Sequence, residues 1–152
     1  MKKFLVFIFL LFIVAVCSFG SGYKFLRLEK SAKIELFVTN ISASLNEDFI
    51  KNGEGYIVHT NNLKLEDTLK NVSGVYGVSY LLEGGVEDYE GLKNKVKVQN
   101  VQESENICTF YGFLSGFDKF TYIDGKKVNV QIAYNSENSR LIIGFPIILG
   151  SY

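Results

Sequence analysis

Four carboxylates lie close together near the middle of the chain: Glu83, Glu87, Asp88 and Glu90. Two carboxylates that flank a glycosidic bond can serve as general acid and as base or nucleophile, so this acidic cluster could hydrolyse sugars. No histidine or arginine lies near them in sequence to shift a pKa, and their spacing does not fit a calcium loop. Acids also interact favourably with the dipole at the start of a helix, and we favour this second interpretation.

The other residue types that often carry catalysis occur singly. His59 is the only histidine and lies on a predicted strand with no obvious serine, cysteine or metal partner, so we expect a structural role. The two cysteines, Cys17 and Cys108, form no CxxC or Cys/His metal spacing, and Cys108 is expected to be a small buried hydrophobe. Ser115 lacks the glycines that flank the serine of a nucleophile elbow. We therefore expect no metal, cofactor or catalytic centre.

Aromatic residues are unusually dense in the C-terminal half, and this surplus is the most informative binding signal. Alternation along the predicted strands places most of them in the core, but some could line a surface for a glycan or a peptide. We take Tyr111, Phe113 and Phe117 as the candidate binding residues, and an exposed site requires at least two of them to be highly accessible. The full set is Phe110, Tyr111, Phe113, Phe117, Phe120 and Tyr122.

The first residues of the chain are typical of an export signal. Lys2 and Lys3 precede thirteen apolar residues, 4–16, and the small-residue stretch 17–22 follows. At 1.5 Å per residue the apolar run covers about 20 Å, less than the ~30 Å hydrocarbon core of a bilayer. We expect a signal peptide cleaved after Gly20, with an uncleaved membrane anchor as the alternative. A lipoprotein is not favoured, because Val16 directly precedes Cys17.

The charge balance gives no reason to expect a nucleic-acid partner. The chain has 16 basic and 16 acidic residues; removing Lys2 and Lys3 leaves 14 and 16, a net charge of −2. Proteins that bind nucleic acids usually present a basic face to the phosphates. Residues 23–152 are long enough to form one domain with its own core.

In the N-terminal half of this domain, hydrophobic periodicity predicts three strands and two helices. The strand at 33–43 alternates, with Ile34, Leu36 and Val38 on one side. The helix at 64–73 is expected to be capped by Asn61 or Asn62 and to end at Gly74. The remaining predicted elements are a polar connection at 46–55, strands at 56–60 and 75–83, and a short helix at 86–96.

From residue 106 onward the pattern is that of sheet. A strand is predicted at 107–117, and Asp124-Gly125 is a strong signal for a hairpin between two further strands. In the second of these, residues 128–134 alternate, so one face is expected to be buried and the other wet. Residues 135–140 are predicted to form a polar turn.

The chain closes on the apolar sequence LIIGFPIILGSY. Residues 141–149 are too few for a membrane helix, and Gly144 and Pro146 disfavour helix in general. The lack of alternation predicts an interior strand that is covered on both faces, with an irregularity at the glycine and proline.

Motifs in the C-terminal half are similar to those of a known family. They are GLKNKVKV, CTFYGFLSGF, DGKKVNVQIAY and the closing LIIGFPIILGSY. On these residues, 84–152 resembles the YwmB family of exported proteins of Gram-positive bacteria, although Phe145 and Ser151 stand where the family often has threonine and an acidic residue. The resemblance implies a fold like that of the TATA-box-binding protein, and it implies no established activity and no DNA binding.

The sequence therefore predicts an α+β protein: a curved antiparallel sheet with two short helices packed on one face, preceded by the signal or anchor helix at 1–22. We expect a non-enzymatic, extracytoplasmic protein of the cell envelope that binds an envelope protein or a cell-wall polymer. It would be secreted, or held on the outer side of the cytoplasmic membrane through its N-terminal segment alone. The alternative function is an envelope glycan hydrolase that uses a pair of the carboxylates.

Overall fold

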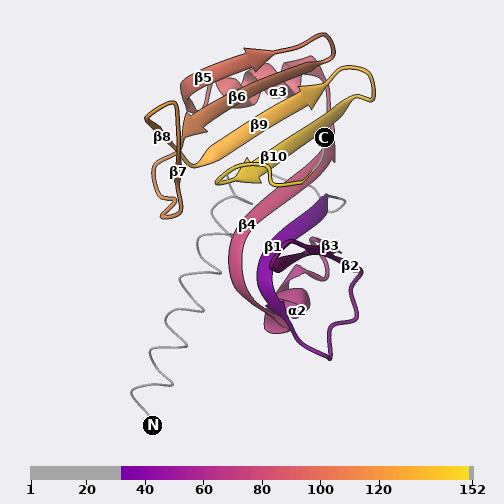
Figure 1. Cartoon of the computed structure of the whole chain (residues 1–152). Helices are drawn as coiled ribbons and strands as arrows, with labels where there is room; N and C mark the ends of the chain where they lie inside the picture. The colour runs from indigo at the N-terminus through magenta and orange to yellow at the C-terminus, as the bar shows by residue number, and fades with distance from the viewer. Residues whose placement is uncertain (1–31, 151–152) are drawn as a thin grey trace.

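The computed structural model describes residues 32–150, and the expected signal or anchor segment lies outside the described residues. In this part of the chain, ten strands and two helices follow one another as shown in Figure 1. They are β1 (Lys33–Ile41), β2 (Phe49–Asn52), β3 (Gly55–Asn61), α2 (Leu65–Lys70), β4 (Val72–Glu83), α3 (Val86–Lys93), β5 (Lys97–Glu103), β6 (Ile107–Phe113), β7 (Thr121–Ile123), β8 (Lys126–Val128), β9 (Val130–Asn135) and β10 (Arg140–Phe145).

Eight of these strands form one sheet in the order β2-β3-β1-β4-β10-β9-β6-β5, and every neighbouring pair is antiparallel. The first four strands in this order come from the N-terminal half of the domain and the last four from the C-terminal half. The long, curved β4 meets β10 at the seam between the halves (Figure 1). Strands β7 and β8 form a separate two-stranded hairpin. The expectation of an antiparallel sheet with two short helices is confirmed.

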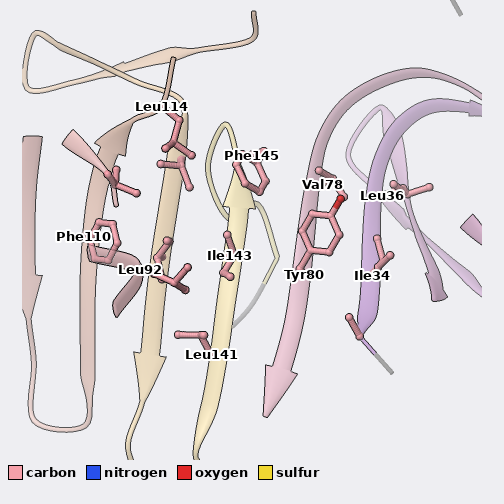
Figure 2. Close-up of a cluster of buried hydrophobic side chains, with 14 of the residues drawn as sticks. Ile34, Leu36, Val78, Tyr80, Leu92, Phe110, Leu114, Leu141, Ile143 and Phe145 are labelled. Carbon is pink, nitrogen blue, oxygen red and sulfur yellow. The ribbon is translucent and has the colours of Figure 1, made fainter. Parts of the chain in front are cut away.

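One face of the sheet, here called the helix face, carries the hydrophobic core. Alternate residues of adjacent strands point to this side, and Figure 2 shows them side by side. The rings of Tyr80 on β4 and Phe145 on β10 meet edge to face across the seam, with 6.1 Å between centroids. Tyr89 and Leu92 of α3 pack on the C-terminal half of this face, and Leu65 and Leu69 of α2 join the same cluster. Its strand members include Ile34, Leu36, Val58, Val78, Phe110, Ile132, Leu141 and Ile143.

Strand β10 lies inside the sheet, between β4 and β9, and Leu141 through Phe145 are all buried. The prediction of an interior strand covered on both faces is therefore confirmed. The strand ends at Phe145 and is therefore shorter than the expected 141–149. It ends there because Pro146 has no amide hydrogen with which to continue the ladder.

Residues 146–150, here called the strap, turn back and cross the face of the sheet opposite the helices (Figure 1). The strap backbone lies directly on Gly144, where a Cβ atom would be 2.4 Å from the amide nitrogen of Ile148. Farther along, Leu149 contacts Gly77 on β4, and Gly150 lies beside Phe37 on β1. The strap thus runs from β10 across β4 to β1 and bridges the seam. This second side of the sheet is called the strap face below.

Sequence-based expectations about α2 are corrected. The helix ends at Lys70 rather than near Ser73, because Val72 already begins β4. Gly74 does not end the helix; it lies within β4 at a φ of +64°. The cap prediction is wrong: α2 has no side-chain cap, and Asn61 Oδ1 accepts hydrogen bonds from the backbone amides of Leu63 and Lys64, which precede the helix.

Expectations about the strands also change. Residues 49–52 in the predicted polar connection pair with β3 as the edge strand β2, and residues 97–103 form the unpredicted edge strand β5. The predicted second hairpin strand breaks at Asn129, so that β8 and β9 are separate strands. The wet face expected for it is wrong: Gln131 and Ala133 are buried, and the strap amide of Ile148 bonds to Gln131.

The seating of the strap predicts that Gly144→Ala is destabilising. A methyl group at this position would meet the backbone of Ile147 and Ile148, which cannot rotate away as a side chain can. Overpacking of this kind typically costs about 1–3 kcal/mol, so the free energy of unfolding in urea should fall by that amount.

Gly91→Ala is the matched control, because no atom lies within 4 Å of a Cβ at this exposed helix position. Alanine is there the better helix former, by about 0.8–1 kcal/mol. A Gly144→Ala variant as stable as the wild type would contradict the close approach of the strap.

Candidate binding surface

The β7–β8 hairpin is held against the edge strand β5 by polar contacts. Asp124 and Gly125 form its turn with φ values of +49° and +74°. Asp124 Oδ2 accepts a hydrogen bond of 2.9 Å from Asn100 Nδ2, and Lys126 Nζ donates one of 2.8 Å to the carbonyl of Gln99. Gln99 is the extra residue where the β5–β6 register shifts. The bulge in β5 thus positions a carbonyl that fixes the hairpin.

A buried asparagine fixes the other end of the hairpin. Asn129, which is 1% exposed, follows β8 directly. Its side chain accepts a 2.7 Å hydrogen bond from the amide of Leu114 and donates one of 2.7 Å to the carbonyl of the same residue. This pair of bonds imitates a strand pairing between the end of β6 and the start of β9. The start of the loop between residues 114 and 120 is therefore held at a fixed position beside the end of the hairpin.

On this fixed hairpin, two large aromatic side chains face solvent. Phe120 is 44% exposed and Tyr122 is 62% exposed, and their rings meet edge to face at 5.7 Å between centroids. Lys127, which pairs with Tyr122 across the hairpin, places Nζ 3.8 Å from the centroid of Phe120 and 5.4 Å from that of Phe113. We call Phe113, Phe120, Tyr122 and Lys127 the aromatic surface. It combines accessible ring faces with one ammonium group.

A row of polar side chains continues from the aromatic surface along the strap face. Tyr111 lies two residues before Phe113 on β6, and so it points to the same side of the sheet. Its hydroxyl donates to Gln102 Oε1 on β5 at 3.3 Å and accepts from Gln131 Nε2 on β9 at 3.4 Å. Ring faces and hydrogen-bonding groups are therefore presented on one side of the sheet.

The structure divides the three binding residues expected from sequence. Tyr111 and Phe113 lie together on the strap face. Phe117 instead stacks on Phe145 at the core, with 4.9 Å between centroids and planes 8° apart. All three are half-buried, so the high accessibility of at least two of them that an exposed site requires is not found. Their participation in binding stays a prediction.

The exposed members of the aromatic surface, Phe120 and Tyr122, were not among the residues chosen from the sequence. A signal for them exists in the turn: Asp124-Gly125 fixes a two-residue hairpin, which pairs Tyr122 with Lys127. Along the hairpin, Thr121, Ile123 and Val128 are half-buried or buried, whereas the alternate pair Tyr122 and Lys127 is exposed. The same alternation that buries one side of the hairpin therefore leaves Tyr122 at the surface.

The carboxylates of the acidic cluster are all exposed, and the structure supports their role at the start of a helix. Asp88 Oδ2 accepts a 2.8 Å hydrogen bond from the amide of Gly85, the residue before α3. Glu87 shares the first turn, and Glu90 faces Lys93 at 3.7 Å one turn later. Glu83 belongs to the end of β4. Among residues 32–150, no group of three or more His, Cys, Asp or Glu side chains could hold a metal ion.

The single histidine and the cysteine of the described region have structural surroundings. His59 Nδ1 lies 3.7 Å from Glu35 Oε1 across β3 and β1, and the histidine is exposed whereas the glutamate is half-buried. Cys108 is a half-buried free thiol on β6 that packs against the core. The expected burial of Cys108 is thus met only in part.

Comparison with protein-family models gives no match, and neither curated proteins nor solved structures give one. Between residues 32 and 150, no helix has the length and apolar character needed to cross a bilayer.

Burial raises the pKa of Tyr89, on the inner side of α3, from its ordinary value of 10 to about 12. Its ring is 3% exposed, and its hydroxyl oxygen has no hydrogen-bond partner among the described residues. The folded protein therefore favours the neutral phenol. Stability from this preference is complete below pH 10 and is lost as the pH rises toward 12.

We expect Tyr89→Phe to reduce this alkaline loss. A pKa shift of two pH units corresponds to about 2–3 kcal/mol. Between pH 9 and pH 12, the free energy of unfolding should therefore fall by up to this amount more in the wild type than in Tyr89→Phe. Denaturation by urea at each pH measures it, with exposed Tyr122→Phe as the control. Parallel stability curves for wild type and Tyr89→Phe would contradict the expectation.

Proposed function

We propose that the chain is a non-enzymatic protein of the cell envelope, located outside the cytoplasmic membrane, that binds a cell-wall polymer or an envelope protein through its aromatic surface. The observation that carries this proposal is the exposure of Phe120 and Tyr122 on a hairpin fixed by Asn100, Lys126 and Asn129. These fixing contacts are polar and do not use the two exposed rings.

A fixed aromatic surface is suited to binding because its side chains lose little freedom when a ligand arrives. Tyr and other aromatic residues are also enriched among the residues that dominate binding energy. The ring faces can pack on the C–H faces of sugars, and Lys127 can meet an anionic group. Tyr111 and Gln102 supply nearby hydroxyl and amide groups for sugar hydroxyls. This mixture favours a glycan polymer as the first ligand to test.

Membership of the YwmB family, with its sheet like that of the TATA-box-binding protein, is part of the same proposal. It is supported by the curved antiparallel sheet with α2 and α3 on one side (Figure 1). It is supported too by the closing Gly-Phe-Pro sequence, because Gly144 is the point on which the strap rests.

The double substitution Phe120→Ala/Tyr122→Ala should weaken binding to isolated cell-wall material by ~10-fold or more, the effect of losing about 1.4 kcal/mol at a binding hot spot. Sedimentation of the purified protein with peptidoglycan sacculi, with and without attached polymers, measures the bound fraction. Pull-down from an envelope extract tests the protein-partner version.

Phe49→Ala is the matched control, because Phe49 is 46% exposed and also meets a tyrosine, Tyr56, edge to face at 5.9 Å. Equal binding by the wild type and the double variant, or equal loss in the control, would rule out the aromatic surface as the site.

The proposed location predicts that the exported protein begins at Ser21, after cleavage behind Gly20. Intact-mass measurement of protein recovered from the outer side of the membrane should give the mass of residues 21–152. The full mass would indicate an uncleaved anchor, and recovery from the cytosol would overturn the proposed location.

A further inference from the structure

We infer that the ligand of the aromatic surface is a polyanion, namely a cell-wall polymer whose units are joined by phosphodiester groups. This inference rests on the proposed function and narrows it from cell-wall polymers in general to this charged class. The observation that carries it is the position of three lysines, Lys97, Lys126 and Lys127, which we call the lysine group.

Three contacts place the lysine group at the aromatic surface. Lys97 is opposite Phe113 in the pairing of β5 with β6, so the two side chains lie on the same face of the sheet. Lys127 Nζ lies 5.4 Å from the centroid of the same Phe113 ring. Lys126 Nζ donates a 2.8 Å hydrogen bond to the carbonyl of Gln99, two residues after Lys97 on β5. All three lysines are exposed, so an anion can reach them.

The lysine group is held in place by uncharged partners. No carboxylate of residues 32–150 forms a salt bridge with any of the three lysines. Lys127 Nζ lies over the ring of Phe120, and Lys126 uses a backbone carbonyl, which takes one of its three N–H donors. The one acidic residue of the hairpin, Asp124, accepts a hydrogen bond from Asn100. Ammonium groups held in this way keep their charge for an anion and lose little freedom when it binds.

The positive charge belongs to this surface and not to the whole domain. Residues 23–152 have 14 basic and 16 acidic residues, a net charge of −2. Residues 113–128 together with Lys97 contain four basic and two acidic residues, a net charge of +2. At the opposite edge of the sheet, around exposed Phe49, residues 46–56 contain one basic and three acidic residues, a net charge of −2. Of these two exposed ring surfaces, only the one on the hairpin is combined with positive charge.

The residue type of the lysine group favours phosphate over carboxylate. Lysine acts as a point charge toward phosphate, whereas arginine is the side chain that binds planar carboxylates with two parallel hydrogen bonds. Residues 93–135, which contain the aromatic surface, have no arginine. Ammonium groups on both β5 and the hairpin match an anion that repeats, as phosphodiester groups do along a polymer. The rings beside them can pack on the C–H groups of the units between the phosphates.

The double substitution Lys97→Gln/Lys127→Gln tests the inference, with soluble poly(glycerol phosphate) as the probe. Lys126 is kept because its bond to Gln99 fixes the hairpin. Titration calorimetry should give a dissociation constant about 3–20-fold higher than that of the wild type, the effect of losing two exposed charge pairs. The affinity of the wild type should also fall as salt is raised, and that of the variant should fall less steeply.

Lys33→Gln/Lys51→Gln is the matched control. It removes the same charge from two exposed lysines on β1 and β2, in the other half of the sheet. Polymer binding should be close to that of the wild type. Equal weakening in the two double variants, or no weakening in Lys97→Gln/Lys127→Gln, overturns the inference.

Two further probes separate this inference from the proposed function. A neutral chitin oligosaccharide that binds more tightly than the polymer, and is lost in Phe120→Ala/Tyr122→Ala, overturns the phosphodiester ligand and upholds the proposed function. Vesicles of phosphatidylglycerol present the same glycerol phosphate group on a lipid, and tighter binding to them than to the polymer also overturns the inference. Failure to bind the polymer, the oligosaccharide and isolated sacculi overturns the inference and the proposed function together.

Discussion

The architecture depends on covering both faces of β10. This strand joins the two halves of the sheet, since β4 lies on one side of it and β9 on the other. Leu141, Ile143 and Phe145 enter the core on the helix face, and each fully buried side chain of this size contributes about 1.5–3 kcal/mol. Ile142 and Gly144 lie on the opposite face, against which neither α2 nor α3 packs. The strap supplies the missing cover from the same chain, and glycine at 144 makes room for it.

The strap and the β7–β8 hairpin share the strap face between them. The strap crosses from β10 toward β1, whereas the hairpin is fixed to β5 at the far edge of the C-terminal half. The row formed by Gln102, Tyr111 and Gln131 lies between these two coverings. Buried polar groups need partners, and Gln131, the buried member of this row, finds them in Tyr111 on the neighbouring strand β6 and in the strap amide of Ile148.

Periodicity predicted the strands and helices whose two faces differ in polarity. It failed where the length of an element, or cover by a distant segment of the chain, determines the structure. The alternation of Ile34, Leu36 and Val38 gave β1, and the unbroken apolar run gave the interior place of β10. Edge strands β2 and β5 were not predicted because their residues are mostly polar or exposed, so that their sequences resemble those of loops. The burial of Gln131 was missed for a different reason: its cover comes from the strap, and no local pattern contains that contact. For the candidate site, the sequence revealed the aromatic surplus, but it could not show that Phe117 stacks on Phe145 at the core while Tyr111 and Phe113 lie on the strap face.

Phe49 and Phe120 each expose a ring that meets a tyrosine edge to face, and the two exposed rings have different physical explanations. Phe49 lies on the edge strand β2 and contacts Tyr56 of the neighbouring strand, so its ring supports a cross-strand pairing that is only four residues long. Lys51 on the same strand discourages further edge pairing. Phe120 and Tyr122 support no such pairing with the main sheet, because the hairpin is fixed by Asn100, Lys126 and Asn129 through polar atoms. The pairing of β2 with β3 thus accounts for the exposed ring of Phe49. No comparable pairing accounts for the exposed rings of Phe120 and Tyr122, and for this reason we propose the aromatic surface as the binding site.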